Sequence, residues 1–369
     1  MAVAQGYGKT VTSGSVFAYD VADTRNSYIG QPTTNLVLFN VTVANFNNDY
    51  GANLVSQTAD YNITYRGRPS VRVISVGQWN LYRAGRPGNF TATSSTIFTF
   101  SWKMKWADGK VPSFVVGYIY TDADYFYPGV TVTPLEDGWY LCQTTGGGTS
   151  SPVWLAGFNS SQTGTCYVTD WQVETKSYAT QFTTANTTRS ATQGLLPLVG
   201  NSTIDLTNVS FDSNAQITFD GTNDYIDLGY APFSGTGAFT IETVYTLNTT
   251  DTHTLIGNYP ASSLQFMGRY GLYINGSCYF PSSLGPGTYY AAATRDGSGT
   301  CKLYLNGVLV NTATNSTNIG TNSFRMGTNT SGGEVLNGKI PVMKLYNRGL
   351  SGAEIRQNYL HYKTRFNLS

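Results

Sequence analysis

A series of strands and hairpins that ends in one capped helix, within residues 219–359, constrains the fold more than any other feature. Phe219–Gly229 and Leu303–Val310 each carry a strand-like run beside an Asp-Gly or Asn-Gly pair, and such pairs favour tight hairpin turns. Ser351 and Glu354 follow with the spacing of a capping box, in which the two side chains satisfy backbone donors at a helix start. The order predicts antiparallel strands followed by a helix that begins near Ser351.

The composition places the chain in the all-β class. Charged residues make up 12% of it, against roughly 25% in an average globular protein. The 369 residues include 40 glycines and 27 tyrosines. Strand-forming β-branched and aromatic residues alternate with Gly, Asn and Asp turns, a pattern that indicates many short strands.

The C-terminal segments resemble the concanavalin A-like (laminin-G-like) sandwich modules that are common in structural proteins of tailed bacteriophages. The matching words are FDGTNDYIDLG from Phe219, FTIE from Phe239, KLYLNGVLV from Lys302 and KLYNRGLSGAEIRQNY from Lys344. Each word alone is a general strand or turn signal, but together and in this order they are specific. The resemblance implies a β-sandwich fold.

The first strand of such a sandwich is expected at the other end of the chain. Ser15–Asp20 reads as that strand, whereas its expected continuation begins only near Gly194. The residues between them contain further alternating runs at Val71–Val76, Ile97–Trp102, Phe114–Tyr120, Trp139–Gln143 and Cys166–Val173. Their spacing and period of two suit a jelly-roll sandwich.

This middle region resembles the carbohydrate-binding jelly rolls appended to glycosidases and to phage fibre proteins. The residues that carry the resemblance are Phe98–Trp102, Asp137–Leu141 and Trp171–Thr180. Insertion of one domain at a surface loop of another is tolerated when the guest's ends lie close together. We therefore predict two antiparallel β-sandwich (jelly-roll) domains, one inserted in the other, with one short C-terminal α-helix. The predicted domains are a discontinuous concanavalin A-like sandwich, 1–35 plus 186–369, and an inserted jelly roll, 36–185. The alternative is three domains in series.

The charge and hydropathy patterns exclude two classes of partner. A formal net charge of +1, from 22 basic and 21 acidic residues, provides no clustered basic face for a nucleic acid. No window approaches the roughly 20 apolar residues of a membrane span, and residues 1–10 lack the pattern of a signal peptide. We expect a protein that is made in a host cytoplasm and carried in a virion.

Four cysteines lie in strand-like runs: Cys142, Cys166, Cys278 and Cys301. None forms the Cys-x-x-Cys pair that usually indicates a zinc site. In a reducing compartment we expect free thiols that pack as small apolar groups. Two disulfides within the domains are the alternative.

No sequence motif indicates catalysis. Glycoside hydrolases with this fold place two carboxylates on a Glu-x-Asp-x-x-Glu strand, and that motif does not occur in the sequence. His253 and His361 lie in unrelated contexts, and neither has a nucleophile elbow nearby. We predict a protein that is not an enzyme and needs no cofactor.

Calcium is an open question, because related sandwiches hold this ion with Asp and Asn oxygens. The candidate ligands are Asp220, Asn223 and Asp224, with Asp296 in a second turn. Turn formation explains each of these residues without a metal.

Sugar binding requires an aromatic ring that stacks on the sugar, flanked by hydrogen-bonding side chains. The densest group of candidates lies in residues 118–127, and Trp106 is a further option. The predicted glycan-binding residues are Tyr118, Tyr120, Tyr125, Tyr127 and Trp154. The alternative is that these aromatic side chains fill the jelly-roll core or a subunit contact.

The two resemblances imply a non-enzymatic phage virion structural protein, in the capsid decoration, neck or tail fibre, that acts by assembly and surface display. Its partners would be copies of itself in a homo-oligomer such as a trimer or ring, other virion proteins and host surface glycans. The alternative function is a receptor-binding adhesin that recognises host surface polysaccharide.

Overall fold

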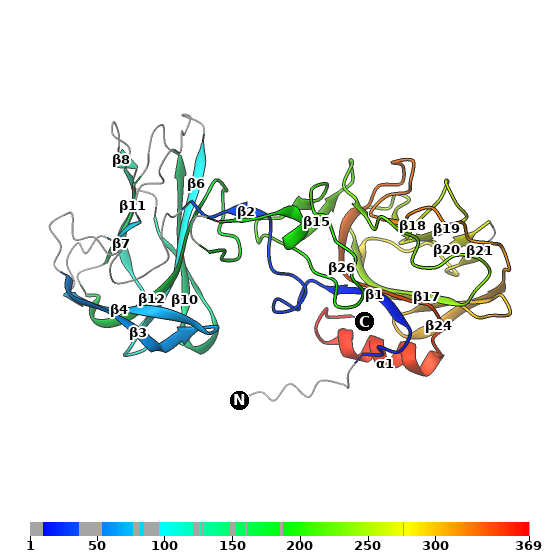
Figure 1. The fold of residues 1–369 in the computed structure, drawn as a ribbon, viewed down its shortest axis with the longest axis horizontal. Helices are drawn as coiled ribbons and strands as arrows, with labels where there is room; N and C mark the ends of the chain where they lie inside the picture. Colours follow the sequence, from blue (N-terminus) through cyan, green and yellow to red (C-terminus); the bar gives the residue numbers. More distant parts are fainter. Residues whose placement is uncertain are drawn as a thin grey trace. The chain divides into compact units, whose positions relative to one another are not determined.

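A computed structural model describes residues 10–36, 54–76, 82–84, 96–120, 125–126, 129–147, 153–158, 161–184, 187–275 and 277–368. The chain divides into two compact units (Figure 1). Unit 1 consists of Met1–Gln31, Ser190–Asp212 and Gln216–Ser369, and unit 2 consists of Pro32–Arg189 and Ser213–Ala215.

The larger sheet of unit 1 joins the two ends of the chain. β1 (Ser15–Asp20) runs antiparallel to β26 (Asn337–Tyr346), with Phe17 opposite Leu345. The remaining strands follow the order β14-β15-β26-β17-β22-β23-β24. Their bounds are β14 Ser210–Phe211, β15 Ile217–Asp220, β17 Phe239–Leu247, β22 Gly287–Arg295, β23 Thr300–Leu305 and β24 Val308–Thr314. The strand expected at Ser15–Asp20 is therefore present and lies beside a C-terminal strand.

A smaller antiparallel sheet of unit 1 has the order β16-β25-β18-β19-β20-β21. Its strands are β16 Ile226–Asp227, β25 Arg325–Met326, β18 Thr254–Gly257, β19 Leu264–Met267, β20 Gly271–Ile274 and β21 Ser277–Tyr279. One apolar core contains residues of both sheets, including Phe239 and Leu345 from the larger and Phe266 and Met326 from the smaller. Two sheets that share a core in this way form a β-sandwich.

The helix α1 (Gly352–Lys363) covers the other face of the larger sheet. Ser351 caps it, and a reciprocal capping box with Glu354 is formed as the sequence predicts. Ile355, Tyr359 and Tyr362 are buried with Val342 and other residues of the sheet in a second apolar cluster. The all-β prediction with one C-terminal helix is confirmed.

Unit 2 contains a six-stranded and a four-stranded antiparallel sheet, in the orders β3-β4-β12-β6-β10-β9 and β5-β11-β7-β8. The first sheet consists of β3 Leu54–Tyr65, β4 Arg68–Val76, β12 Thr163–Glu174, β6 Ile97–Trp106, β10 Tyr140–Gly147 and β9 Thr131–Pro134. The second consists of β5 Tyr82–Ala84, β11 Val153–Phe158, β7 Phe114–Tyr120 and β8 Tyr125–Phe126. Alternate residues of β6 fill the core of unit 2: Phe98, Phe100, Trp102, Met104 and Trp106. Trp106 is only 1% exposed, so its suggestion as a sugar-binding platform was wrong.

A two-stranded ladder joins the first and last segments of unit 2. β2 (Thr33–Thr34) pairs antiparallel with β13 (Thr188–Arg189). The side-chain hydroxyls of Thr34 and Thr188 lie 2.8 Å apart. The two ends of unit 2 therefore leave it side by side, which is the geometry that makes insertion of a domain into a surface loop tolerable.

All four cysteines are free and buried, two in each unit. Burial raises the pKa of the Cys166 thiol to about 12 and that of Cys278 to about 11. The prediction of free thiols that pack as apolar groups is confirmed, and the disulfide alternative was wrong.

Candidate functional site

The outer face of the smaller sheet in unit 1 carries an ordered row of side chains. Cross-strand pairing aligns the residues of this row in the order Asp227, Arg325, Gly257, Gln265 and Tyr273. The neighbouring row consists of core residues: Ile226, Met326, Ile256, Phe266 and Leu272. Because side chains alternate between the two faces of a sheet, the first row points away from the core. We call its four side chains, those of Asp227, Arg325, Gln265 and Tyr273, the polar row.

An ion pair forms one end of the polar row. Nε of Arg325 donates to Oδ2 of Asp227 at 3.0 Å, and the two side chains are 29% and 34% exposed. The guanidinium carbon lies 4.8 Å from the ring centre of Tyr225, within the range of a cation–π contact. Nη1 also donates to the carbonyl of Thr330 at 3.4 Å. The guanidinium is thus held in place while part of it remains open to solvent.

The middle position of the row carries no side chain. A Cβ added at Gly257 would lie 2.4 Å from the carbonyl oxygen of Leu264 and 2.8 Å from Cα of Gln265. Both atoms belong to the backbone, so a larger residue cannot be accommodated without moving β19. Arg325 and Gln265 therefore flank a buried position that has no side chain.

A buried polar network supports the second half of the row. Gln265 is only 2% exposed, and its amide donates to the hydroxyl of Thr254 and to Oε2 of Glu334. The Thr254 hydroxyl also donates to Oε2 of Glu334 at 3.2 Å. Glu334 has a left-handed backbone with φ of 54°, which few non-glycine residues adopt. The network fixes the Glu334 carboxylate beside the polar row.

Two tyrosines stand at the other end of the row. Tyr259 follows β18 and Tyr273 lies on β20, and both are half-buried. Their ring centres are 5.4 Å apart and the ring planes meet at 80°, an edge-to-face arrangement that aromatic pairs favour. An aromatic pair beside fixed carboxylate, amide and guanidinium groups has the components of a carbohydrate site.

The charges of this face sum to a small negative value. The side chains of Asp227 and Glu334 are acidic and that of Arg325 is basic, so the three charges leave one net negative charge. Within the part of the chain that the structure describes, no three or more His, Cys, Asp or Glu side chains form a group that could hold a metal ion. The chemistry available on the face is hydrogen bonding and stacking.

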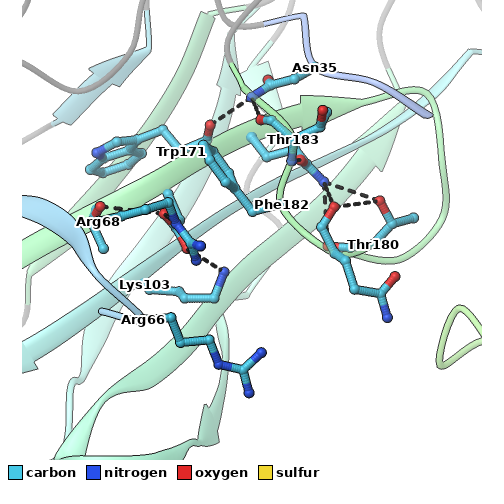
Figure 2. Close-up of polar contacts among 12 residues, drawn as sticks. Asn35, Arg66, Arg68, Lys103, Trp171, Thr180, Phe182 and Thr183 are labelled. Atoms are coloured by element: carbon cyan, nitrogen blue, oxygen red, sulfur yellow. Dashed lines mark hydrogen bonds and ion pairs between the residues drawn. The ribbon is translucent and has the colours of Figure 1, made fainter. Parts of the chain in front are cut away.

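The outer face of the six-stranded sheet in unit 2 has a different organisation. The buried carboxylate of Asp170 accepts two bonds from Arg68, at 2.6 and 2.5 Å, and lies 3.0 Å from Nζ of Lys103 (Figure 2). Both cations also lie over the rings of Tyr65 and Phe182, at 5.2 to 5.9 Å. Burial alone would raise the pKa of Asp170, but the hydrogen bond from Arg68 and the charge of Lys103 hold that pKa below its ordinary value. Each charge in this cluster has its partner within the unit.

The same face is closed by the segment that follows β12. The carboxylate of Glu174 accepts bonds from the backbone N–H and the hydroxyl of Thr180 and from the hydroxyl of Thr33. Asn35 donates to the carbonyls of Trp171 and Thr183 (Figure 2). We call this set the clasp, because it ties the first and last segments of unit 2 to the end of β12. The clasp gives a structural role to the Gln-Val-Glu and Ala-Thr sequence near the end of unit 2, because Glu174 holds Thr33 and Thr180 against the end of β12.

The side chains predicted to bind glycans lie outside the described part of the structure. Tyr118 and Tyr120 are on β7, Tyr125 is on β8 and Trp154 is on β11, but only their backbone is described, and Tyr127 is outside the described residues. Their role stays a prediction.

The calcium candidates act in turns. Oδ2 of Asp224 accepts from the backbone N–H groups of Ser210 and Asp220, and Oδ1 of Asp220 accepts from that of Thr222. Asp296 bonds in the same way to Ser298 and Thr300, and Asn223 is exposed. His253 is buried, with ring nitrogens 2.9 Å from the Thr249 hydroxyl and the Val335 carbonyl.

The polar row was missed at the sequence level. One signal was available: a single polar residue interrupts two short apolar strands, Gln265 in Leu264–Met267 and Tyr273 in Gly271–Ile274. The other half of the row pairs residues that are 98 positions apart in the chain, and no local pattern connects them.

Comparison with known proteins identifies the fold of unit 1. Residues 220–356 match the model of the concanavalin A-like lectin/glucanases superfamily. The chain contains a lectin-like, concanavalin A-like domain. The matched segment includes the whole polar row. No curated protein matches the chain in sequence.

Several solved structures are similar in fold to part of the chain. The binding domain of Paraclostridial Mosquitocidal Protein 1 is 15% identical with a TM-score of 0.35, and the match covers 45% of this chain and 49% of that one. Domain 4 of a GH43 extracellular arabinanase from Geobacillus stearothermophilus is 19% identical with a TM-score of 0.32, covering 44% and 84%. A putative carbohydrate binding protein from Bacteroides ovatus is 13% identical with a TM-score of 0.33, covering 76% and 79%.

The chain spans about half the length of the mosquitocidal binding domain. At these identities and TM-scores the three structures indicate nothing about the ligand of this chain. No helix in the described part of the chain is both long and apolar enough to cross a membrane.

Proposed function

We propose that the protein is a non-catalytic recognition protein that binds a glycan on the outer face of the smaller sheet of unit 1. The observation that carries this proposal is the polar row, in which Tyr273, with Tyr259 beside it, shares one surface with the Arg325–Asp227 pair. The tyrosine rings would stack on the apolar face of a sugar, and the guanidinium and carboxylate would bond to its hydroxyl groups.

The charge of the face supports a neutral glycan as the ligand. An acidic sugar would approach the carboxylates of Asp227 and Glu334, while Arg325, the cation of the polar row, is already paired with Asp227. Like-charge contacts of this kind reject a ligand even where its shape fits. Neutral hexose or pentose oligomers should therefore bind more tightly than uronic or sialic acid polymers.

The biological setting we propose is a tailed-phage virion, in which the protein assembles with copies of itself and with other virion proteins and displays the glycan site. The support is the order of four sequence words that resemble virion sandwich modules. A map of the particle tests the setting: icosahedral positions would indicate capsid decoration, and a single vertex or tail tip would indicate a neck component or adhesin. Absence from purified particles would contradict it.

A glycan array tests the function. The wild-type chain should bind neutral oligosaccharides, and Tyr273→Ala should remove most of the signal. Tyr167→Ala is the matched control, because Tyr167 is also a half-buried strand tyrosine but lies on β12 of unit 2. If only acidic glycans bind, or if both variants bind as the wild type does, the proposed site is wrong.

Two further measurements separate the alternatives. Incubation of a bound oligosaccharide with the protein should release no new reducing ends, and release would show an enzyme. Loss of binding on Trp154→Ala or Tyr125→Ala, with Tyr273→Ala unaffected, would move the site to the jelly roll and favour the adhesin.

A further inference from the structure

We propose that the side chains of Lys344 and Asn358 become joined by an intramolecular isopeptide bond, with Glu242 as the group that transfers the proton. The three residues come from three elements of unit 1: Glu242 from β17, Lys344 from β26 and Asn358 from α1. The bond fastens the C-terminal helix covalently to the larger sheet. This inference does not rest on the glycan site.

The three side chains meet where α1 packs on the larger sheet. Cross-strand pairing places Glu242 directly opposite Lys344, and such partners have Cβ atoms about 4.5–5.5 Å apart on one face of a sheet. Nδ2 of Asn358 donates to Oε2 of Glu242 at 2.6 Å. Nζ of Lys344 lies 5.5 Å from the ring centre of Tyr362, which is one turn after Asn358 on the same face of the helix. Glu242 is therefore a neighbour of both the amine and the amide.

All three groups are buried. Glu242 and Asn358 are 0% exposed and Lys344 is 5% exposed, and Oε1 of Glu242 has no hydrogen-bond partner. Burial raises the pKa of Glu242, which makes its carboxylate a stronger base, and lowers the pKa of Lys344, which favours the uncharged amine. The other acid near Lys344 is Asp20 on β1, whose carboxylate bonds to Arg365 at 2.7 Å. An uncharged amine beside a base is the state that a lysine nucleophile requires.

The Asn358 amide is held in an orientation that suits attack. Its Oδ1 accepts from the backbone N–H of Val11 at 2.8 Å, and the hydroxyl of Tyr346 donates to the carbonyl of Val11 at 3.0 Å. A donor on the carbonyl oxygen stabilises the negative charge that develops there when the carbon is attacked. The nitrogen that must leave, Nδ2, is the atom bonded to Glu242. The segment before β1 thus stabilises the oxyanion, and Glu242 faces the leaving group.

The reaction balances without a co-reactant. The uncharged amine of Lys344 attacks Cγ of Asn358 and forms the new C–N bond. The Glu242 carboxylate takes one proton from Nζ and returns one to Nδ2, which is general base and then general acid catalysis. The bond between Cγ and Nδ2 breaks and ammonia leaves. Nothing is oxidised or reduced, and Glu242 ends in the protonation state in which it began.

Mass spectrometry of the denatured full chain tests the bond. The wild type should weigh about 17 Da less than its sequence, the mass of one ammonia. Because a succinimide at an Asn-Gly pair also releases ammonia, a tryptic digest should locate the loss in a branched peptide that joins residues 340–348, uncut after Lys344, to residues 357–363. Lys344→Met and Glu242→Gln should have the full masses of their sequences. Lys339→Met is the matched control on β26, where Lys339 pairs with Asp212, and it should keep the loss.

Asn358→Asp gives a second, positive readout. An aspartic acid would condense with Lys344 and release water, so this variant should weigh about 18 Da less than its own sequence. Three results would overturn the proposal: a wild type with its full mass, a branched peptide that joins Lys344 to a residue other than Asn358, or an unchanged loss in Lys344→Met or Glu242→Gln. The wild-type mass decides without any variant, and circular dichroism confirms that each variant compared with it is folded.

Discussion

The outer faces of two sheets in this chain carry similar residues, but these residues differ in how far they are exposed to solvent. On unit 2, an Arg–Asp pair, a lysine and two aromatic rings contact one another, and the Asp170 side chain is 1% exposed. On unit 1, an Arg–Asp pair and Tyr273 are spread along the polar row, Tyr259 lies beside Tyr273, and the ion pair is about one third exposed. We call the first the closed face, and the second, whose ion pair stays partly exposed, the open face.

The difference shows why a list of residue types does not identify a binding site. Arginine, aspartate and aromatic residues are common in carbohydrate sites, and both faces have them. On the closed face the groups satisfy each other and fasten the last segment of the module. On the open face Gly257 leaves the centre of the row without a side chain. What distinguishes the faces is the exposure of their Arg–Asp pairs to solvent.

Removal of the whole inserted region is the most drastic test of this comparison. If only the open face binds glycans, a protein in which residues 36–185 are replaced by a short linker should stay soluble and keep its affinity. This experiment also tests the predicted nested division, because domains arranged in series would tolerate the loss of residues 1–35 instead. An insoluble product would contradict the nested division. A soluble product that no longer binds glycans would contradict a binding site on the open face.

Loss of the Asp170 carboxylate from the closed face should strongly lower the free energy of unfolding of unit 2. Asp170→Ala leaves Arg68 and Lys103 without their counter-charge, and breaking a buried ion pair in this way costs about 3–5 kcal/mol. Urea unfolding followed by tryptophan fluorescence measures the effect on unit 2 specifically, because all six tryptophans lie between residues 79 and 171. Asp170→Asn is the control for the backbone, since asparagine tolerates the φ of 55° found here.

The same carboxylate should give unit 2 a distinct acid sensitivity. Its folded-state pKa lies below the ordinary value of 3.8, so the stability that it contributes is present above that value and is lost as the pH falls through the folded pKa. The urea midpoint of the wild type should therefore fall more than that of Asp170→Asn below about pH 3.8. Equal decreases of the two urea midpoints would show that the ion pairs of Asp170 do not stabilise unit 2.

Loss of the ion pair on the open face should have the smallest effect on the free energy of unfolding. Asp227→Asn breaks the Arg325 pair, but exposed pairs contribute about 1 kcal/mol or less. Differential scanning calorimetry should show a shift of the unit 1 transition that corresponds to no more than this. A loss above about 2 kcal/mol would mean that the open face, like the closed one, is mainly structural.

The sequence predicted those features that depend on local signals. Ser351 and Glu354 located the helix start, and Ser15–Asp20 was recognised as a strand. Trp106 was misjudged although the signal was present: Phe98, Phe100, Trp102 and Met104 alternate with it in period two, the pattern of one buried strand face. The polar row depends on the pairing of short strands that are distant in the chain, and this pairing is set by the sandwich as a whole.

Isothermal titration calorimetry of one array-positive neutral oligosaccharide tests the central claim most directly. The dissociation constant should rise at least about tenfold in Tyr273→Ala, equivalent to about 1.4 kcal/mol, and should stay within twofold of the wild type in Tyr167→Ala. Unchanged affinity in Tyr273→Ala, or an equal loss in Tyr167→Ala, would contradict a glycan site on the open face of unit 1.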